Sequence, residues 1–168
     1  MSVFESVENI KNYLKDEFYK NQDLLKLIAY PSDNPLSGSD IEDVHALEGN
    51  CIFFGTSSTN FEDEAKVFLY IKYESRPHKN SPVYDDVIIT FDIMFHEQLE
   101  LLYDNSSRIN GIMKRIEKIV CRPSAVGMGV VRSIGGNINF QVNKNYKGAR
   151  YKYKTTVFAY DPNSEYYG

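Results

Sequence analysis

The stretch ITFDIMFHEQLELLYDNSSRINGIMKRIEKIV, residues 89–120, decides the fold. It continues a segment, 86–97, whose apolar side chains populate both faces of an extended chain, which predicts a central strand covered on both sides. After a short polar break, apolar residues recur every three or four positions and predict an amphipathic helix over about 106–121. Asp104 or Ser106 can cap this helix, and Pro123 follows its end.

Working outward toward the N-terminus, the same periodicity predicts a helix from residue 3 to residue 18. A second, short helix over 22–29 follows, with Asn21 as its cap and Pro31 as its stop. The next segment, 31–49, is rich in Pro, Ser, Gly and Asp, so we expect a long acidic loop that is mobile when the subunit is alone.

Alternating or continuous apolar runs predict the remaining strands. A Gly135-Gly136 pair predicts a tight hairpin turn between two of them. Residues 75–82 and 145–148 are expected to be turns. The predicted strands cover 50–55, 65–74, 125–134, 137–144 and 149–160.

This order predicts an α+β fold: a mainly antiparallel β-sheet of about five to six strands, with an N-terminal helix and one helix (about 106–121) packed on it. We expect the whole chain, 1–168, to form a single domain. Its parts are an N-terminal helical segment 3–30, the acidic loop 31–49, an α+β body 50–160 and a flexible C-terminal tail 161–168.

Composition narrows the functional classes. The 168 residues are 42% hydrophobic and include thirteen Tyr and ten Phe, as expected for a globular domain. The start shows no secretory signal, and no stretch approaches the apolar length that spans a bilayer, so we expect a protein made and kept in the reducing cytoplasm, without a membrane partner. Cys51 and Cys121 lie in no metal or disulfide motif and are interpreted as two small buried hydrophobic residues.

Charge is divided unevenly along the chain. Residues 1–105 hold eight Lys and Arg against twenty Asp and Glu, whereas residues 106–154 hold eleven against one, Glu117. The net charge of −4 therefore conceals an acidic part and a basic part. Such a division suggests a complementary field, directed toward a polyanion or toward another copy of the molecule.

Motifs for catalysis are missing from the sequence. His45, His78 and His96 share no ligand spacing, and His96-Glu97 is more simply a polar strand end than an acid–base pair. The glycine-rich stretches fit neither a dinucleotide site nor a phosphate loop. We therefore expect no enzyme, with no catalytic, cofactor-binding or metal residues.

Candidate interface residues come from the two charged parts. The basic residues beside tyrosines near the C-terminus fit a solvated sheet face, an edge strand protected by Lys, a protein interface or a nucleic-acid groove. The basic candidates are Arg108, Lys114, Arg115, Lys118, Arg132, Lys144, Lys147, Arg150, Lys152 and Lys154, and the acidic candidates are Asp40, Glu42 and Asp43.

The order of elements, with a both-face apolar strand leading into a basic amphipathic helix over 89–120 and strands after it, resembles the tail terminator (tail completion) proteins of tailed bacteriophages. The resemblance implies a homo-hexameric ring that caps the tail tube, ends its polymerisation and joins the tail to the head and neck. It implies contacts with the tail tube protein and a neck or head completion protein, and with the sheath protein if the tail is contractile.

In that setting DNA only passes through the ring, and the protein is found in the virion and, during assembly, in the host cytoplasm. Two alternatives stay open. One is a nucleic-acid-binding module that uses the basic region 106–154, and the other is a different neck component, such as a head completion protein, as the long loop 31–49 suggests.

Overall fold

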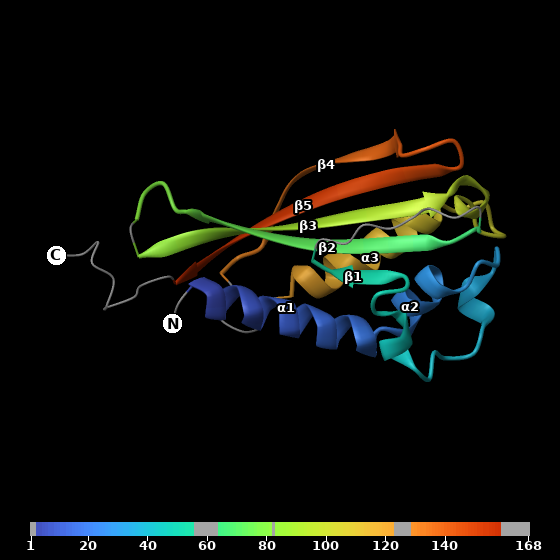
Figure 1. The fold of residues 1–168 in the computed structure, drawn as a ribbon, viewed down its shortest axis with the longest axis horizontal. Coiled ribbons are helices and arrows are strands. Elements are labelled where there is room, and N and C mark those ends of the chain that lie inside the picture. The colour runs from blue at the N-terminus through green and yellow to red at the C-terminus, as the bar shows by residue number, and fades with distance from the viewer. Residues whose placement is uncertain (1–2, 56–63, 82, 123–128, 159–168) are drawn as a thin grey trace.

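The computed structural model describes residues 3–55, 64–81, 83–122 and 129–158 and has the α+β architecture predicted from the sequence (Figure 1). The helices are α1 (Val3–Lys20), α2 (Gln22–Ala29) and α3 (Arg108–Val120). Short 3-10 turns are η1 (Pro35–Ser37), η2 (Val44–Leu47) and η3 (Glu97–Leu99). The strands are β1 (Ile52–Phe54), β2 (Val67–Pro77), β3 (Tyr84–His96), β4 (Arg132–Gln141) and β5 (Tyr146–Phe158).

The five strands form one sheet in the order β1-β2-β3-β5-β4. The pairs β2–β3, β3–β5 and β4–β5 are antiparallel, and only the short β1 runs parallel to its neighbour. The mainly antiparallel sheet is therefore confirmed. The central position predicted for the strand at 86–97 is also confirmed, because β3 lies between β2 and β5.

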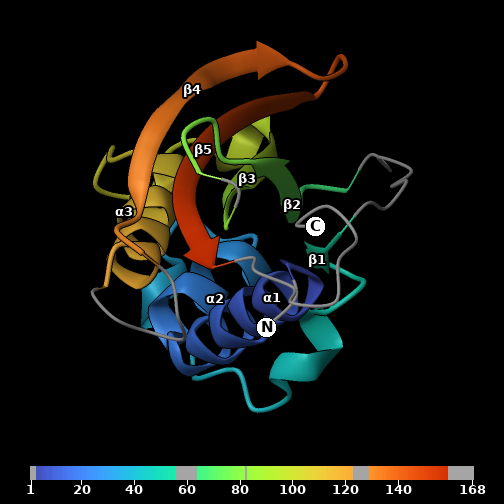
Figure 2. The same cartoon turned by 90° about the vertical axis from the view of Figure 1, so that its left-hand side faces the viewer.

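All three helices lie on one side of the sheet, as the end-on view in Figure 2 shows. Alternate residues of β3, such as Phe91 and Ile93, face this layer and are fully buried. They pack with the inward stripes of the helices, for example Phe18 of α1 and Ile112 of α3, in one continuous core. The opposite side of the sheet has no helix over it among the described residues.

Two caps show how closely local chemistry fixes the helices. Asn21 caps α2 as predicted, with its side chain accepting from the Leu24 N–H. For α3 the predicted caps are wrong: Ser107 is the N-cap and accepts from the Asn110 N–H at 3.4 Å. Asp104 instead accepts from the Ser106 N–H and hydroxyl, which closes the turn before the helix.

The predicted hairpin at Gly135-Gly136 is wrong. Both glycines lie inside the single strand β4, and the turn to β5 falls at 142–145 instead of separating two strands at 135–136. Gly135 has φ +119°, and it adjoins a bulge in the β4–β5 register. At Gly136 an added Cβ would lie 2.4 Å from the Arg150 carbonyl oxygen, so close strand packing requires glycine there. The predicted strand start at 125–128 lies outside the described residues, as does the tail 161–168.

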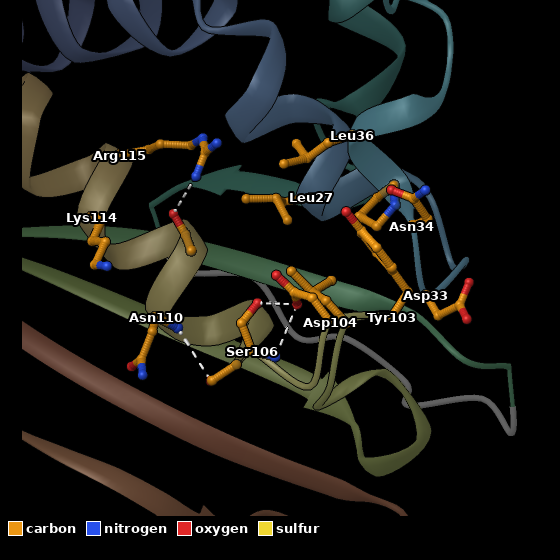
Figure 3. Close-up of a pocket in the computed structure, with 14 residues that line it drawn as sticks. Leu27, Asp33, Asn34, Leu36, Tyr103, Asp104, Ser106, Asn110, Lys114 and Arg115 are labelled. Carbon is orange, nitrogen blue, oxygen red and sulfur yellow. Dashed lines mark hydrogen bonds between the residues drawn. The ribbon is translucent and has the colours of Figure 1, made fainter.

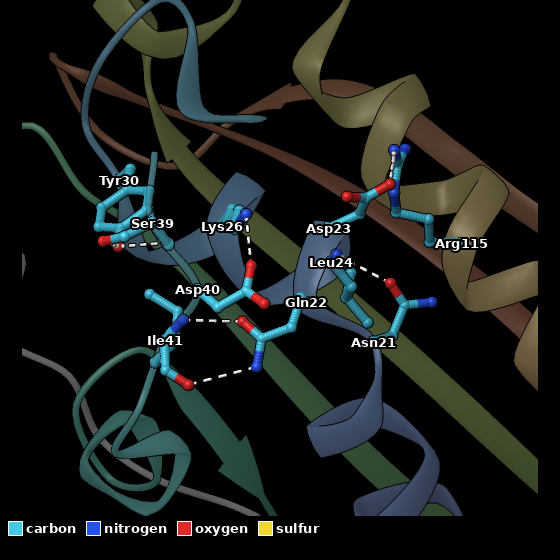
Figure 4. Close-up of polar contacts among 10 residues, drawn as sticks. All are labelled: Asn21, Gln22, Asp23, Leu24, Lys26, Tyr30, Ser39, Asp40, Ile41 and Arg115. Atoms are coloured by element: carbon cyan, nitrogen blue, oxygen red, sulfur yellow. Dashed lines mark hydrogen bonds and ion pairs between the residues drawn. The ribbon is translucent and has the colours of Figure 1, made fainter. Parts of the chain in front are cut away.

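The acidic segment 31–49 takes a defined path across α2 and includes η1 and η2, which the prediction of one irregular loop missed (Figure 4). Gln22 makes two hydrogen bonds with the backbone of Ile41: its Nε2 donates to the Ile41 carbonyl, and its Oε1 accepts from the Ile41 N–H. Lys26 pairs with Asp40 at 2.7 Å, and Tyr30 donates to the Ser39 carbonyl. The mobility expected of this loop in the free subunit stays a prediction.

Candidate assembly surfaces

The side of the sheet away from the helices, named here the open face, is defined by strand register. Its residues alternate with the core residues along each strand, and cross-strand partners share the face. Its charged members are Lys72, Glu74, Arg76, Asp86, Asp92, Arg132, Arg150, Lys152 and Lys154. The open face thus carries six cationic and three acidic side chains.

Asp92 lies at the centre of the open face with no exposed surface. Lys72 Nζ lies 2.9 Å from its Oδ2, and Arg150 binds both carboxylate oxygens, with Nε 2.5 Å from Oδ1. Burial alone would raise the pKa of Asp92, but the hydrogen bonds from Arg150 and Lys72 outweigh it and hold the pKa below its usual value. One covered carboxylate therefore anchors two cations whose side chains remain about two-fifths exposed, at 41% and 43%.

A second ionic group lies further along the same strands. Asp86 accepts from Lys154 at 3.1 Å, from the Thr156 hydroxyl at 3.0 Å and contacts His78 Nδ1 at 2.9 Å. Burial raises the pKa of Asp86, whereas these hydrogen bonds lower it by more, so the carboxyl stays ionised to lower pH than a free aspartate. Lys154 is thereby fixed in place on the open face.

Aromatic side chains flank this charged band on both ends. At one end Phe53 stacks on Tyr70 with ring centroids 4.8 Å apart, in a cluster that also holds Phe68 and Tyr146. At the other end Tyr84 and Phe158 meet edge to face at 5.7 Å, and both are exposed. Aromatic rings beside arginines are typical of the centres of protein interfaces.

The larger part of the helical side has the opposite charge, whereas α3 is basic, with Arg108, Lys114, Arg115 and Lys118 against Glu117. Residues 3–49, which form α1, α2 and the acidic segment, hold ten Asp and Glu against four Lys. Folding therefore places much of the acidic part of the sequence and much of the basic part on opposite sides of the sheet. Some ion pairs nevertheless join the two parts. Lys147 pairs with Glu100, and Arg122 pairs with Glu17, so these cations are neutralised within the subunit.

The structure separates the predicted basic residues other than Arg108 into three groups. Arg132, Arg150, Lys152 and Lys154 come together on the open face. Lys144 lies exposed in the β4–β5 turn, and Lys147 lies at the end of the sheet near β3.

Lys114, Arg115 and Lys118 belong to α3, on the helical side, and Arg115 is paired with Asp23 at 2.8 Å. Lys114 and Arg115, but not Lys118, border a groove of about 480 Å³, which is also lined by Leu36 of η1, Tyr103 and Asn110 (Figure 3).

Arg108 is wrong as an interface residue, because it is completely buried. Its guanidinium donates to the carbonyls of Leu27, Tyr30 and Leu99, each at 2.9 Å, and to that of Ser32. Burial lowers the pKa of Arg108. All the hydrogen-bond partners of its guanidinium among the described residues are backbone carbonyls, and none is an acidic side chain. Arg108 clamps the end of α2 and the start of the acidic segment onto α3.

The predicted acidic residues are partly committed to local structure. Asp40 holds Lys26, and Asp43 accepts from the Ala46 N–H as the cap of η2. Glu42 is exposed beside them. All three lie in the acidic layer, on the helical side of the sheet.

Sequence reasoning missed the residues that organise the open face. Asp92 was available as a signal, since a lone carboxylate in an apolar central strand needs cationic partners. Tyr84 and Phe158 gave no signal, because their pairing depends on the register of distant strands. His96, by contrast, is a buried strand-end residue whose Nδ1 accepts from the Gln98 N–H, so its simpler interpretation as a polar terminus agrees with the structure.

The cysteines differ from the expectation in part. Cys51 is buried and free, whereas Cys121, directly after α3, is exposed and free, so its interpretation as a buried hydrophobic residue is wrong. Within the described ranges, no group of three or more His, Cys, Asp or Glu is placed to hold a metal ion. In the same part of the chain, no helix has both the length and the apolar character needed to cross a bilayer.

Fold and surfaces together define an α+β protein whose sheet is covered on one side and carries a charged, aromatic face on the other. The family model described as YomW matches residues 21–155, which include every element except α1 and the last three residues of β5. The chain therefore belongs to the YomW family, a phage-associated family of the Bacillus prophage type. A search of curated proteins finds no significant match.

Proposed function

We propose that this phage-associated protein is a structural protein of the virion, of the tail terminator kind, and catalyses no reaction. Copies of it close into a ring at the end of the tail tube, a hexamer as in the tail terminators that its order of elements resembles. The ring ends tube polymerisation and offers its other surface to a neck or head completion protein. A sheath protein is a further partner where the tail contracts, and DNA passes through the ring.

One observation carries this proposal: a basic, aromatic open face lies across the sheet from the acidic surface of α1, α2 and the segment 31–49 in the same subunit. Two unlike surfaces that attract each other favour a head-to-tail contact between copies. Repeating one such contact by rotation gives a ring when the rotation closes. Membership of a phage-associated family supports a role in phage assembly, which is where the proposal sets the ring.

The test is the mass and shape of the purified protein. Native mass spectrometry at low salt and micromolar concentration should give one closed oligomer, and electron micrographs should show rings. Because screening weakens contacts between exposed charges, the same rings should dissociate toward monomers in high salt. Monomers alone in low salt, or filaments of no fixed length, would remove the proposal.

A nucleic-acid-binding role is a second candidate, favoured by Arg132 and Lys152, which are exposed on the open face and form no ion pair within the described chain. It predicts an affinity for DNA whose logarithm falls steeply with the logarithm of salt. A labelled duplex that does not shift at about 50 mM salt would dismiss it. Such a result leaves the ring proposal in place.

A further inference from the structure

The outward side of α1 carries an exposed phenylalanine followed by polar and acidic side chains. Its exposed positions follow one another at about one helical turn: Phe4, Glu8, Asn12 and Asp16, with Glu5 beside the first. Phe4 is 87% exposed, so its ring adds nothing to the core of its own subunit. The helix packs on the core through its other side, and Phe4, Asn12 and Asp16 of this stripe are left exposed on its outward side.

The open face offers a matching order of groups along β5. The exposed Tyr84–Phe158 pair lies at one end. Lys154, Lys152 and Arg150 follow at alternate positions, all on the same face. An exposed aromatic pair followed by cations is thus the counterpart of an exposed phenylalanine followed by carboxylates.

We propose that α1 of a second copy lies along β5 on the open face, with Phe4 against the Tyr84–Phe158 pair and Asp16 against Lys152. The inference rests on the proposed function and names the surfaces that join the ring. Lengths agree: Phe4 and Asp16 are separated by about 18 Å of helix, at 1.5 Å per residue. Phe158 and Lys152 are separated by about 20 Å of strand, at 3.3 Å per residue.

Direction also agrees. The start of α1 and the end of β5 lie at the same end of the elongated subunit (Figure 1), where the Ser6 hydroxyl reaches the Phe158 carbonyl at 3.5 Å. A second copy placed with its Phe4 on Phe158 therefore points the same way along the long axis as the first. Rotation about an axis parallel to that direction keeps this orientation in every copy, as a ring requires.

The occupant is a second copy, because the two surfaces have complementary charges but lie on opposite sides of the sheet in one subunit, so that the outward side of α1 can reach an open face only in another copy (Figure 2). Each docking event buries one open face and one α1, and leaves one of each at the two ends. The contact is heterologous and continues until the last open face meets the first α1.

The experiment uses charge reversal at the two facing positions, Asp16→Lys and Lys152→Glu, separately and together in the full chain. Both side chains are exposed, so neither change should unfold the protein. Each single variant should raise the concentration at which half the protein is assembled about tenfold or more, by placing like charges in contact. The double variant, in which every contact has its charges exchanged, should return to within about threefold of wild type.

Lys118→Glu is the matched control, since it makes the same charge change on α3, away from the open face, and should leave assembly unchanged. Sedimentation velocity measures all five proteins. If wild type and every variant assemble alike, the α1–β5 contact is overturned while the ring stands. If the double variant stays as defective as the single ones, the Asp16–Lys152 pairing is overturned. If wild type itself never assembles, the proposed function fails, and this contact fails with it.

Discussion

Replacing Arg108 with methionine should destabilise the subunit by about 3–5 kcal/mol, because four carbonyls lose their hydrogen-bond donor while the cost of burying a cation disappears. Methionine keeps the length and apolar stem of the side chain but donates no hydrogen bond. The carbonyls of Leu27, Tyr30, Ser32 and Leu99 would then lose their donor in a site that water reaches poorly. Each unsatisfied carbonyl costs about 1–3 kcal/mol, and no longer burying a cation offsets part of the sum.

A loss of this size is a large share of the stability of a single domain, about 5–15 kcal/mol. Urea denaturation followed by circular dichroism measures it, with Arg122→Met as the control. Arg122 is exposed and makes one ion pair, with Glu17, so its loss should cost less than about 1 kcal/mol. Arg108→Lys, which keeps the charge but reaches fewer carbonyls, should fall between the two. An Arg108→Met protein within about 1 kcal/mol of wild type would refute the clamp.

Three further predictions concern other parts of the fold. Because the pKa of Asp92 is depressed in the folded state, its contribution to stability is present above the unfolded pKa of about 3.9 and is lost as pH falls through the lower folded pKa. The Asp92→Asn variant should therefore be less stable than wild type at pH 6 and should lose less stability on acidification. Urea midpoints from pH 6 to pH 2 measure this, and parallel curves for the two proteins would contradict the network. Gly136→Ala should cost about 1–3 kcal/mol, since its Cβ would meet the Arg150 carbonyl, and a neutral result in thermal unfolding would show that β4 can move away. In the folded protein Cys121 should react with a thiol reagent, and Cys51 should react only after denaturation. The reaction of Cys121 should be slow near neutral pH, because burial and Glu117 raise the pKa of its thiol. Two fast thiols in the native state would be inconsistent with the structure.

Much of the architecture follows from periodicity, because helix and strand patterns report which side of each element meets the core. The stretch 89–120 thus predicts both the central β3 and the amphipathic α3. The error at Gly135-Gly136 arises because glycine serves bulges and close strand contacts as well as turns. Neighbouring sequence does not distinguish these uses, since the decisive contact is with Arg150 on another strand.

Surface predictions depend on a different kind of information. A count of charges along the sequence shows an acidic and a basic part, but pairing across the fold decides which charges remain exposed. Arg108 looks like the other cations of α3 in sequence, yet its place next to the end of α2 buries it. Lys152 and Arg150 become neighbours of Lys72 and Asp92 only through the register of three strands.

We propose that unlike faces of identical subunits join until a ring closes. Native mass spectrometry of the wild-type protein over a range of concentrations tests it most directly. We predict a single oligomer whose mass stops growing once it forms, at six subunits as the resemblance to tail terminators implies. It should revert to monomer as salt is raised. A monomer at every concentration in dilute buffer, or a mass that rises without limit, would contradict it.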